Sequence, residues 1–139
     1  MTVHVPGKAD YAIRAVAELA RRGEPTKCRD VAQAQDIPLK YLVNIFSDLR
    51  RARIVRSQRG ADGGYWLMRS PDKLTLAEVM EAVMGALTTV GGELPGELDY
   101  LPGNEVLSQV WLTLDLRIRG VLESVTVADL VSGDLASLR

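Results

Sequence analysis

Basic and hydrogen-bonding side chains are concentrated between Lys40 and Arg69, and their types and spacing suit contact with a nucleic-acid duplex. This segment carries seven Lys/Arg against two Asp/Glu, a net charge of +5, whereas residues 70–139 carry four against eleven, a net charge of −7. The chain as a whole has a formal net charge of −1. Because polyanions respond to local rather than total charge, the pattern predicts a docking surface for a polyanion on an otherwise acidic chain.

Four polar side chains share one face of the helix predicted over Leu39–Ala52: Lys40, Tyr41, Asn44 and Ser47. Apolar residues occupy the opposite face at the i, i+3, i+4, i+7 spacing of an amphipathic helix. An Asn side chain bonds adenine bidentately, a Lys meets guanine or phosphate, and a Tyr bonds a phosphate or touches a thymine methyl. This face therefore suits a recognition helix in the major groove, although a solvated helix face explains each residue taken singly.

The stretch RSQRGADGGYWLM, Arg56 to Met68, predicts a basic β-hairpin. Alternating residues predict strands over Ile54–Arg59 and Tyr65–Arg69, and the three glycines between them permit a hinge. Arg59 and Gly60 fall at the bend, where a backbone without side chains can approach a narrow groove. Four further arginines are expected to contact phosphates: Arg50, Arg51, Arg53 and Arg56. The alternative is a surface hairpin whose arginines only keep the protein in solution.

The elements that must position these side chains begin with three helices, predicted over Lys8–Arg22, Lys27–Gln35 and Leu39–Ala52. Thr26 is the expected N-cap of the second helix. The tight turn between the second and third helices makes them a helix-turn-helix, and the hairpin that follows is the wing. The predicted fold class is mainly α with a small β-hairpin, a winged helix-turn-helix followed by a long C-terminal dimerisation helix.

A second group of elements follows the hairpin. The capping box TLAE, Thr75 to Glu78, predicts a helix that continues to about Gly85. A long helix is predicted over Asn104–Leu122, and TVAD, Thr126 to Asp129, predicts a final short helix from Leu130. The long helix carries an apolar stripe formed by Leu107, Val110, Trp111, Leu114, Ile118 and Val121.

This apolar stripe is larger than a winged helix of this size needs for its own core, which indicates dimerisation through the long helix. A helix folded back on its own domain is the alternative. The chain then divides into a winged helix-turn-helix DNA-binding domain over 1–86, a linker loop over 87–103, and a dimerisation region over 104–139. The short final helix is expected to pack on the N-terminal helix or on the partner.

The composition excludes several classes of protein. The 139 residues, 47% of them hydrophobic, suffice for one compact domain with an extension. The start of the chain lacks a signal-peptide pattern, and no apolar run is long enough to span a bilayer, so a cytoplasmic location is expected. No nucleophile motif, phosphate-binding loop or dinucleotide fingerprint is present, so neither enzymatic activity nor a cofactor is predicted.

Cys28 is the only cysteine, which excludes an internal disulfide and any metal site that needs two thiolates from one chain. It lies near the predicted start of a helix, where the helix dipole together with Lys27 and Arg29 would lower the pKa of the thiol and permit redox sensing. A small, partly buried residue without special reactivity is the alternative.

With these residues in place, the chain resembles the Rrf2 family (IscR/NsrR/CymR-like) of bacterial winged helix-turn-helix transcriptional regulators over nearly its whole length. The resemblance rests on KADYAIRAVAELA and TVADLV near the two ends, and above all on YLVNIFSDLRRARIVRSQRGADGGYWL. It implies a homodimer with crossing C-terminal helices that binds a palindromic operator in double-stranded DNA. Lys40 and Tyr41 would then lie in the major groove, with Arg59 and Gly60 at the minor groove.

The sequence departs from the family pattern at two places. Many members hold an iron–sulfur cluster through three cysteines between the fourth helix and the long helix, whereas Met84–Glu105 contains no cysteine, so no cluster is expected. Some members carry an acidic residue in the recognition helix where this chain has Val43, so the operator sequence cannot be transferred.

The sequence therefore predicts a homodimeric DNA-binding regulator without a cluster, a repressor rather than an activator. Three alternatives stay open. A small molecule bound between the winged helix and the dimerisation helix would control the regulator, or thiol oxidation at Cys28 would do so. In the third, the winged helix is a protein-interaction module that binds no DNA.

Overall fold

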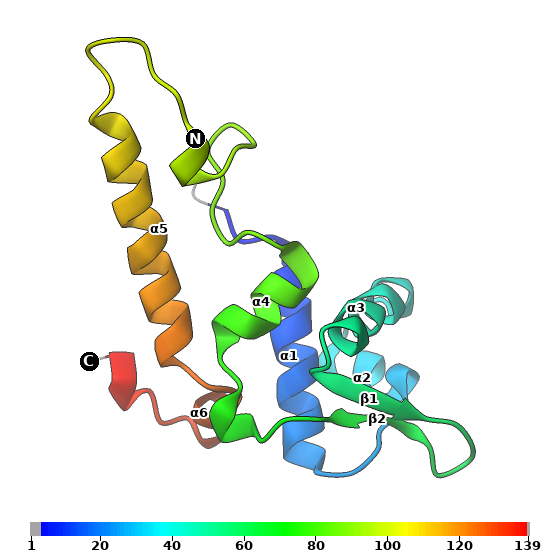
Figure 1. Cartoon of the computed structure of the whole chain (residues 1–139). Helices are drawn as coiled ribbons and strands as arrows, with labels where there is room; N and C mark the ends of the chain where they lie inside the picture. Colours follow the sequence, from blue (N-terminus) through cyan, green and yellow to red (C-terminus); the bar gives the residue numbers. More distant parts are fainter. Residues whose placement is uncertain (1–3, 139) are drawn as a thin grey trace.

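The structure, a computed structural model, describes residues 4–138, so the ends of the first and last predicted regions, 1–3 and 139, lie outside it. The described residues form six α-helices, three short 3₁₀ helices and one antiparallel pair of strands. Figure 1 shows a compact winged helix-turn-helix on one side and a single long helix, α5, on the other. The predicted fold class, mainly α with a small β-hairpin, is confirmed.

Helix α1 (Gly7–Arg22) is the central element, and it packs against α2, α3, α4 and α6. Its core face is built mostly from alanines, with Val16 and Leu19 as the larger buried residues. Small side chains let neighbouring helices approach closely from several directions, since little volume separates the backbones. The helix ends at Gly23, whose left-handed φ of 66° allows its N–H to donate to the Leu19 carbonyl.

The helix-turn-helix consists of α2 (Cys28–Gln35) and α3 (Leu39–Arg51), close to the predicted bounds. Asp36 adopts a left-handed φ of 53° at the turn, and the side chain of Ile37 is buried. The predicted N-cap of α2 is wrong. Lys27 occupies that position without a side-chain cap, and the Thr26 hydroxyl donates to the Glu24 carbonyl instead.

Strands β1 (Val55–Gln58) and β2 (Gly64–Leu67) form the wing, each shorter than predicted. The main chain of Thr26 pairs with that of Tyr65 in β2 through two hydrogen bonds of 2.9 and 2.8 Å. The ring of Tyr65 stacks on Phe46 of α3, with ring centroids 4.4 Å apart. The base of the wing is therefore fixed both to the segment before α2 and to the buried face of α3.

Two capping boxes join the end of the chain to its middle. Thr75 begins α4 (Leu76–Met84) and Thr126 begins α6 (Val127–Ser132), each with its side chain accepting from the backbone N–H three residues on. Helix α6 therefore begins earlier than the predicted Leu130. Backbone hydrogen bonds join the Leu76 N–H to the Val125 carbonyl and the Val127 N–H to the Leu74 carbonyl. Helix α6 packs on α1, and Val127 belongs to the core of the winged helix.

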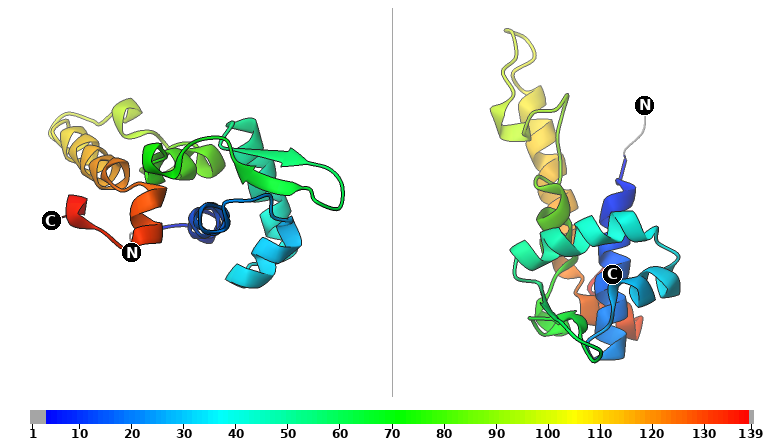
Figure 2. Two further views of the ribbon diagram at one scale, coloured as in Figure 1. Left: turned by 90° about the horizontal axis from the view of Figure 1, so that it is seen from below. Right: turned by 90° about the vertical axis from the view of Figure 1, so that its right-hand side faces the viewer.

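Helix α5 (Leu107–Ser124) lies on the opposite side of the molecule from α3 and the hairpin, as Figure 1 and the left-hand view of Figure 2 show. It begins later than predicted, and it has contacts with α4 and with the 3₁₀ helices η2 (Pro95–Glu97) and η3 (Ala136–Leu138). None of its residues is fully buried. No helix among the described residues has the length and apolar character needed to cross a membrane.

Candidate nucleic-acid interface

Helix α3 presents an amphipathic division that matches the prediction. Its inner face buries Leu42, Ile45, Phe46 and Leu49, each at most 1% exposed. Lys40, Tyr41 and Asn44 are exposed on the outer face, and Ser47 is half-buried. The Lys40 ammonium lies 5.0 Å from the centre of the Tyr41 ring. The first turns of α3 therefore offer a cation, a phenol and an amide to solvent from a helix whose other face is anchored.

The N-terminal part of α1 adds residues to this surface that the sequence analysis missed. Lys8 and Tyr11 line a cavity of about 300 Å³ together with Tyr41, Asn44 and Ile45. The Lys8 ammonium also pairs with Asp48 at 2.8 Å, which ties α1 to α3. The sequence showed only the apolar periodicity of α1. Nothing in that periodicity indicates that its polar face meets α3.

Arginines extend the basic surface from the end of α3 towards the wing. Arg50 and Arg56 are exposed, and Arg50 donates to the Ser57 hydroxyl at 3.4 Å across the junction between α3 and β1. The Arg51 guanidinium is 77% exposed although it pairs with Asp48 at 3.3 Å. Arg53 is also exposed and has a left-handed φ of 60° at the chain reversal after α3, a position that more often carries glycine.

Arg56 is held in place by its partner across the hairpin. Arg56 and Trp66 are paired in register, and the guanidinium carbon lies 4.9 Å from the centre of the indole ring. Such an arrangement restricts the side chain without neutralising its charge. Arg69, at the other end of the second predicted strand, pairs instead with Glu78 of α4 and is not part of this basic surface.

The three glycines of the wing have different roles. Gly60, with Arg59 beside it, is exposed at the bend with a φ of +109° and open space around it. The Lys27 ammonium donates to the Gly60 carbonyl at 3.1 Å. Gly63 and Gly64 are packed against backbone, since an added Cβ would lie 2.1 Å from the Gln58 oxygen or 2.5 Å from the Thr26 carbonyl carbon. The positive φ expected of these glycines is present at Gly60 and at Gly64 (+144°) but not at Gly63, and both Gly63 and Gly64 are also required by close packing against backbone.

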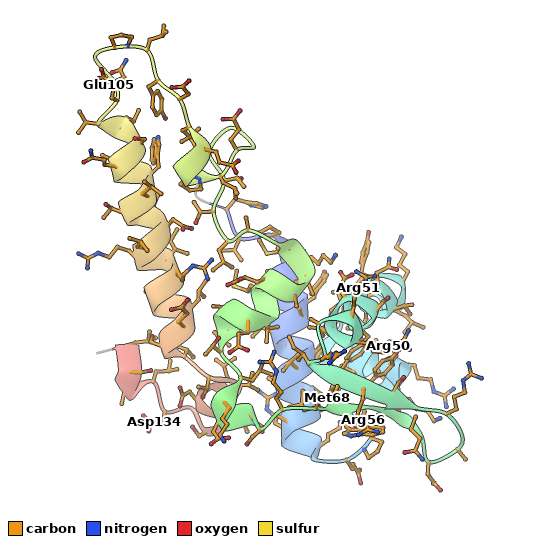
Figure 3. All side chains as sticks on the ribbon, in the orientation of Figure 1. Arg50, Arg51, Arg56, Met68, Glu105 and Asp134 are labelled. Atoms are coloured by element: carbon orange, nitrogen blue, oxygen red, sulfur yellow. The ribbon has the colours of Figure 1, made fainter. Side chains whose placement is uncertain are left out.

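Charge is distributed unevenly between the two sides of the molecule. Figure 3 shows Arg50, Arg51 and Arg56 on the side that carries α3 and the hairpin, with Glu105 and Asp134 on the side that carries α5 and the C-terminus. The right-hand view of Figure 2 shows α3 and the hairpin on one face. The six Lys/Arg residues between Lys40 and Arg59, against Asp48 and Asp62, are thus combined with an exposed helix and a projecting hairpin on one side of the chain.

The predicted apolar stripe of α5 is divided between two environments. Val110, Leu114 and Val121 are exposed to 54%, 40% and 54%. Leu107, Trp111 and Ile118 are half-buried, and the Trp111 indole N–H donates to the Tyr100 hydroxyl at 2.8 Å. Part of the stripe therefore packs within the chain, as the folded-back alternative expected, while an apolar face is left uncovered.

The pKa of the Cys28 thiol is shifted in the opposite direction from the one expected. Burial alone raises the pKa of its thiol to about 11. The thiol is half-buried at the first position of α2. The predicted lowering of the pKa by the helix dipole, Lys27 and Arg29 is therefore wrong, because desolvation of the thiolate outweighs these contributions.

A model of the Rrf2 family, described as "Iron-dependent Transcriptional regulator", matches residues 5–133. A Mycobacterium tuberculosis protein named as an HTH-type transcriptional regulator is 39% identical over 135 residues, which cover 96% of this chain and 84% of that protein. The HTH-type transcriptional regulator CymR of Bacillus subtilis is 32% identical over 128 residues, covering 90% of this chain and 87% of CymR.

Solved structures of the same kind of protein are also similar. IscR of T. potens superposes with a TM-score of 0.77 at 29% identity and covers 96% of this chain and 89% of its own. CymR of B. subtilis, described as its global cysteine regulator, also has a TM-score of 0.77, at 28% identity, and covers 95% of this chain and 98% of its own.

The iron in the family's description raises the question of whether this chain could hold an iron–sulfur cluster. Such clusters are bound by thiolates. The single cysteine lies in α2, and the segment between α4 and α5 offers only carboxylates such as Glu93, Glu97 and Asp99. Within residues 4–138, no three His, Cys, Asp or Glu side chains come together as a metal site. The residues present do not fit a cluster of the cysteine-bound kind.

Proposed function

The chain belongs to the Rrf2 family of transcriptional regulators, and on this premise we propose that it is a homodimeric repressor that reads a palindromic operator without a cluster. Proteins of this family are non-enzymatic and bind DNA. The observation that carries the proposal is the position of the amphipathic helix α3 and a basic hairpin on one side of an otherwise acidic chain. A regulator that binds the chromosome acts in the cytoplasm of a bacterium.

In the proposed complex, the N-terminal half of α3 enters the major groove. Lys40, Tyr41, Asn44 and Ser47 face the base edges there, with Asn44 suited to adenine and Lys40 to guanine or phosphate. Lys8 and Tyr11 of α1 border the same surface and extend it towards the DNA backbone. Base contacts from α3 supply sequence preference, and the surrounding cations fix its position.

The wing contacts the adjacent minor groove in this proposal. Arg59 and Gly60 are at its tip, where the open space around Gly60 allows close approach to the sugar–phosphate backbone. Arg50, Arg51 and Arg56 line the route from α3 to the wing and contact phosphates. Residues 1–86 form the DNA-binding domain, 87–103 the linker, and the exposed apolar residues of α5 pair two copies. Two copies related by a twofold axis present their recognition helices to half-sites one helical turn apart, about 34 Å.

The proposal is tested by selecting bound fragments from the source genome and measuring the affinity for the selected site at several salt concentrations. We expect the affinity to fall steeply with salt, because each neutralised phosphate releases counterions. Arg59→Ala should weaken binding to the selected operator by about 1 to 3 kcal/mol. Arg117→Ala, which removes an exposed arginine from α5, is the matched control and should change little.

Affinity that is insensitive to salt, together with equal binding by Arg59→Ala and wild type, would contradict the proposal and favour a protein-interaction module. The repressor assignment is tested separately with a reporter gene under a promoter that contains the selected site. Expression should rise when the regulator is deleted. A fall in expression would identify an activator.

A further inference from the structure

Asp48 is the only acidic residue of helix α3, and it lies within the basic surface that is proposed to meet DNA. We propose that Asp48 is a positioning residue that sets how strongly the regulator prefers its operator over other DNA. It does so by fixing two neighbouring cations, Lys8 and Arg51, for one docking geometry and by lowering the affinity for all others. The role of Asp48 therefore rests on the proposed function and deepens it.

The carboxylate of Asp48 binds two cations, one through each oxygen. Its Oδ2 accepts from the Lys8 ammonium of α1 at 2.8 Å, and its Oδ1 accepts from the Arg51 guanidinium at 3.3 Å. The Asp48 side chain is only 21% exposed, whereas those of Lys8 and Arg51 are 44% and 77% exposed. The two cations therefore remain open to a polyanion, while the carboxylate that joins them is shielded.

The pair lies beside the residues that are proposed to read bases. Asp48 follows Asn44 by one helical turn and Tyr41 by two, so the three residues share one side of α3. Lys8 is next to the same two residues, because it lines a surface recess together with Tyr41 and Asn44. The ion pair thus joins the N-terminal part of α1 to the reading side of α3, and Asp48 sets where the Lys8 ammonium lies relative to the bases.

The Lys8–Asp48 pair joins two elements that are far apart in the sequence, whereas the pairs of Arg14 and Arg22 each join residues on one helix. A lysine side chain has many rotamers, so only a partner with a fixed position of its own can restrict it. Asp48 has such a position, because α3 is anchored in the core by buried residues such as Leu49. Asp48 therefore holds Lys8 at a defined place before DNA arrives.

The charge of Asp48 lowers the affinity for DNA of any sequence. Binding without sequence preference depends on cations that neutralise phosphates. A carboxylate that already pairs with Lys8 and Arg51 reduces their contribution, and it also repels phosphates directly. Asp48 therefore weakens whatever part of the affinity backbone electrostatics supply.

The operator is affected less than other DNA. When α3 is seated on its operator, Lys40 and Asn44 contact base edges, and Lys8 contacts the adjacent backbone with little further loss of side-chain freedom. A duplex without the operator sequence is bound in many registers, and cations that are fixed for one register do not match the others. Because specificity is a difference between two affinities, a residue that weakens the second kind of complex more than the first raises the preference.

Asp48→Asn in the full-length protein removes the charge and keeps the size of the side chain. Fluorescence anisotropy at several salt concentrations gives the affinities for the selected operator duplex and for a duplex of the same length with both half-sites scrambled. We expect the affinity for the scrambled duplex to rise about tenfold, with a salt slope steeper by about 1, and the operator affinity to rise by about threefold or less. The ratio of the two affinities then falls.

Two further variants separate the position of the charge from its other effects. Asp134→Asn makes the same change on the side that carries α5 and the C-terminus, as Figure 3 shows, and should leave the ratio unchanged. Asp48→Glu keeps the carboxylate and should bring the ratio back towards that of wild type. A loss of folded protein lowers both affinities equally, so a purely structural role for Asp48 does not change the ratio.

Lys8→Met tests the same inference from the other partner, including where Asp48→Asn does not fold. Because Lys8 is held for contact with the operator, we expect its loss to weaken operator binding more than binding to the scrambled duplex. In combination with Asp48→Asn, the same substitution should have a smaller effect on the ratio, since the lysine is no longer held.

An unchanged ratio in Asp48→Asn overturns the inference, as does a fall of the same size in Asp134→Asn. Equal losses on the two duplexes in Lys8→Met overturn it as well. These outcomes are distinguishable from failure of the proposed function, in which wild type itself shows neither a preference for the selected operator nor a dependence on salt.

Discussion

Gly64 in the wing lies directly against the main chain of Thr26, so that an added Cβ would be 2.5 Å from the Thr26 carbonyl carbon and 2.6 Å from its oxygen. The neighbouring pair of hydrogen bonds between Thr26 and Tyr65 holds the two segments at this separation. The close approach fixes the base of the wing to the chain that leads into α2. The wing and the helix-turn-helix therefore form one rigid unit at this point.

Gly64→Ala should consequently destabilise the fold. Alanine at a φ of +144° is strained, and its methyl group would meet backbone rather than a flexible side chain. We expect the free energy of unfolding to fall by about 3 kcal/mol or more, measured by urea denaturation. Gly60→Ala is the control, because its φ is also positive but its surroundings are open, and it should cost about 1 kcal/mol. Equal losses in the two variants would contradict this account of Gly64.

Variants of Arg56 and Trp66 distinguish the effect of the arginine's charge on DNA affinity from the effect of its positioning by the indole ring. Arg56→Ala removes a phosphate contact in the proposed complex, so the slope of log affinity against log salt should become shallower by about 1. Trp66→Leu keeps the charge and removes only the ring beneath it, so we expect an unchanged slope and a loss of about 0.5 to 1 kcal/mol in affinity. An unchanged slope in Arg56→Ala would show that this arginine does not contact the phosphates.

Cys28 should react slowly with alkylating agents at neutral pH. With its pKa raised to about 11, the thiolate fraction at pH 7 is about one in ten thousand. The rate of reaction with iodoacetamide should therefore keep rising with pH beyond 9, whereas the same chain unfolded in urea should follow the ordinary pKa of 9.0. Peroxide treatment should leave DNA binding unchanged in both wild type and Cys28→Ser. An apparent pKa near 7 in the folded protein would restore the redox-sensor interpretation.

The same shift implies a pH dependence of stability with a defined sign. Because the folded state raises the pKa of Cys28, it favours the neutral thiol, and this contribution is fully present below about pH 9. It is lost as the pH rises towards 11. Cys28→Ser should therefore show a smaller decline in the free energy of unfolding than wild type between these two pH values, measured by denaturant titration at each pH.

Local sequence signals predicted the helices well, because their physical causes are local. The capping box at Thr75 depends on residues three positions apart, and it forms as predicted. A box of the same spacing forms at Thr126, although the helix there was predicted to begin only at Leu130. Thr26 was likewise predicted from its local sequence to cap α2, but its side chain does not cap that helix. Its backbone is paired with Tyr65, a residue far along the chain, and no pattern around Thr26 reports that pairing.

The candidate site was predictable in part for the same reason. The exposed face of α3 follows from helical periodicity, so Lys40, Tyr41 and Asn44 could be placed outside from the sequence alone. The contribution of Lys8 and Tyr11 depends on how α1 crosses α3, which is a property of tertiary packing. The burial that raises the pKa of Cys28 likewise comes from its packing against the hydrophobic core, whereas the helix dipole expected to lower the pKa is local.

The exposed apolar face of α5 leads to a prediction about assembly. Val110, Leu114 and Val121 project from one side of the helix, and an aspartate placed among them would be desolvated if a second copy covered this side. Leu114→Asp should therefore weaken dimerisation by about 3 kcal/mol, roughly a hundredfold in the dissociation constant, measured by sedimentation. Operator affinity should fall with it, because a monomer engages only one half-site.

Leu116→Asp provides the matched control for this interface. Leu116 is the more exposed of the two leucines, at 66% against 40% for Leu114. At 3.6 residues per turn, two positions along the helix place the side chains on roughly opposite sides. If the Leu114 face pairs the two copies, Leu116→Asp should leave the dimer intact despite adding the same charge. A dimer that survives Leu114→Asp but not Leu116→Asp would mean that the copies pair through the other side of α5, and the recognition helices would then have a different spacing from the one proposed.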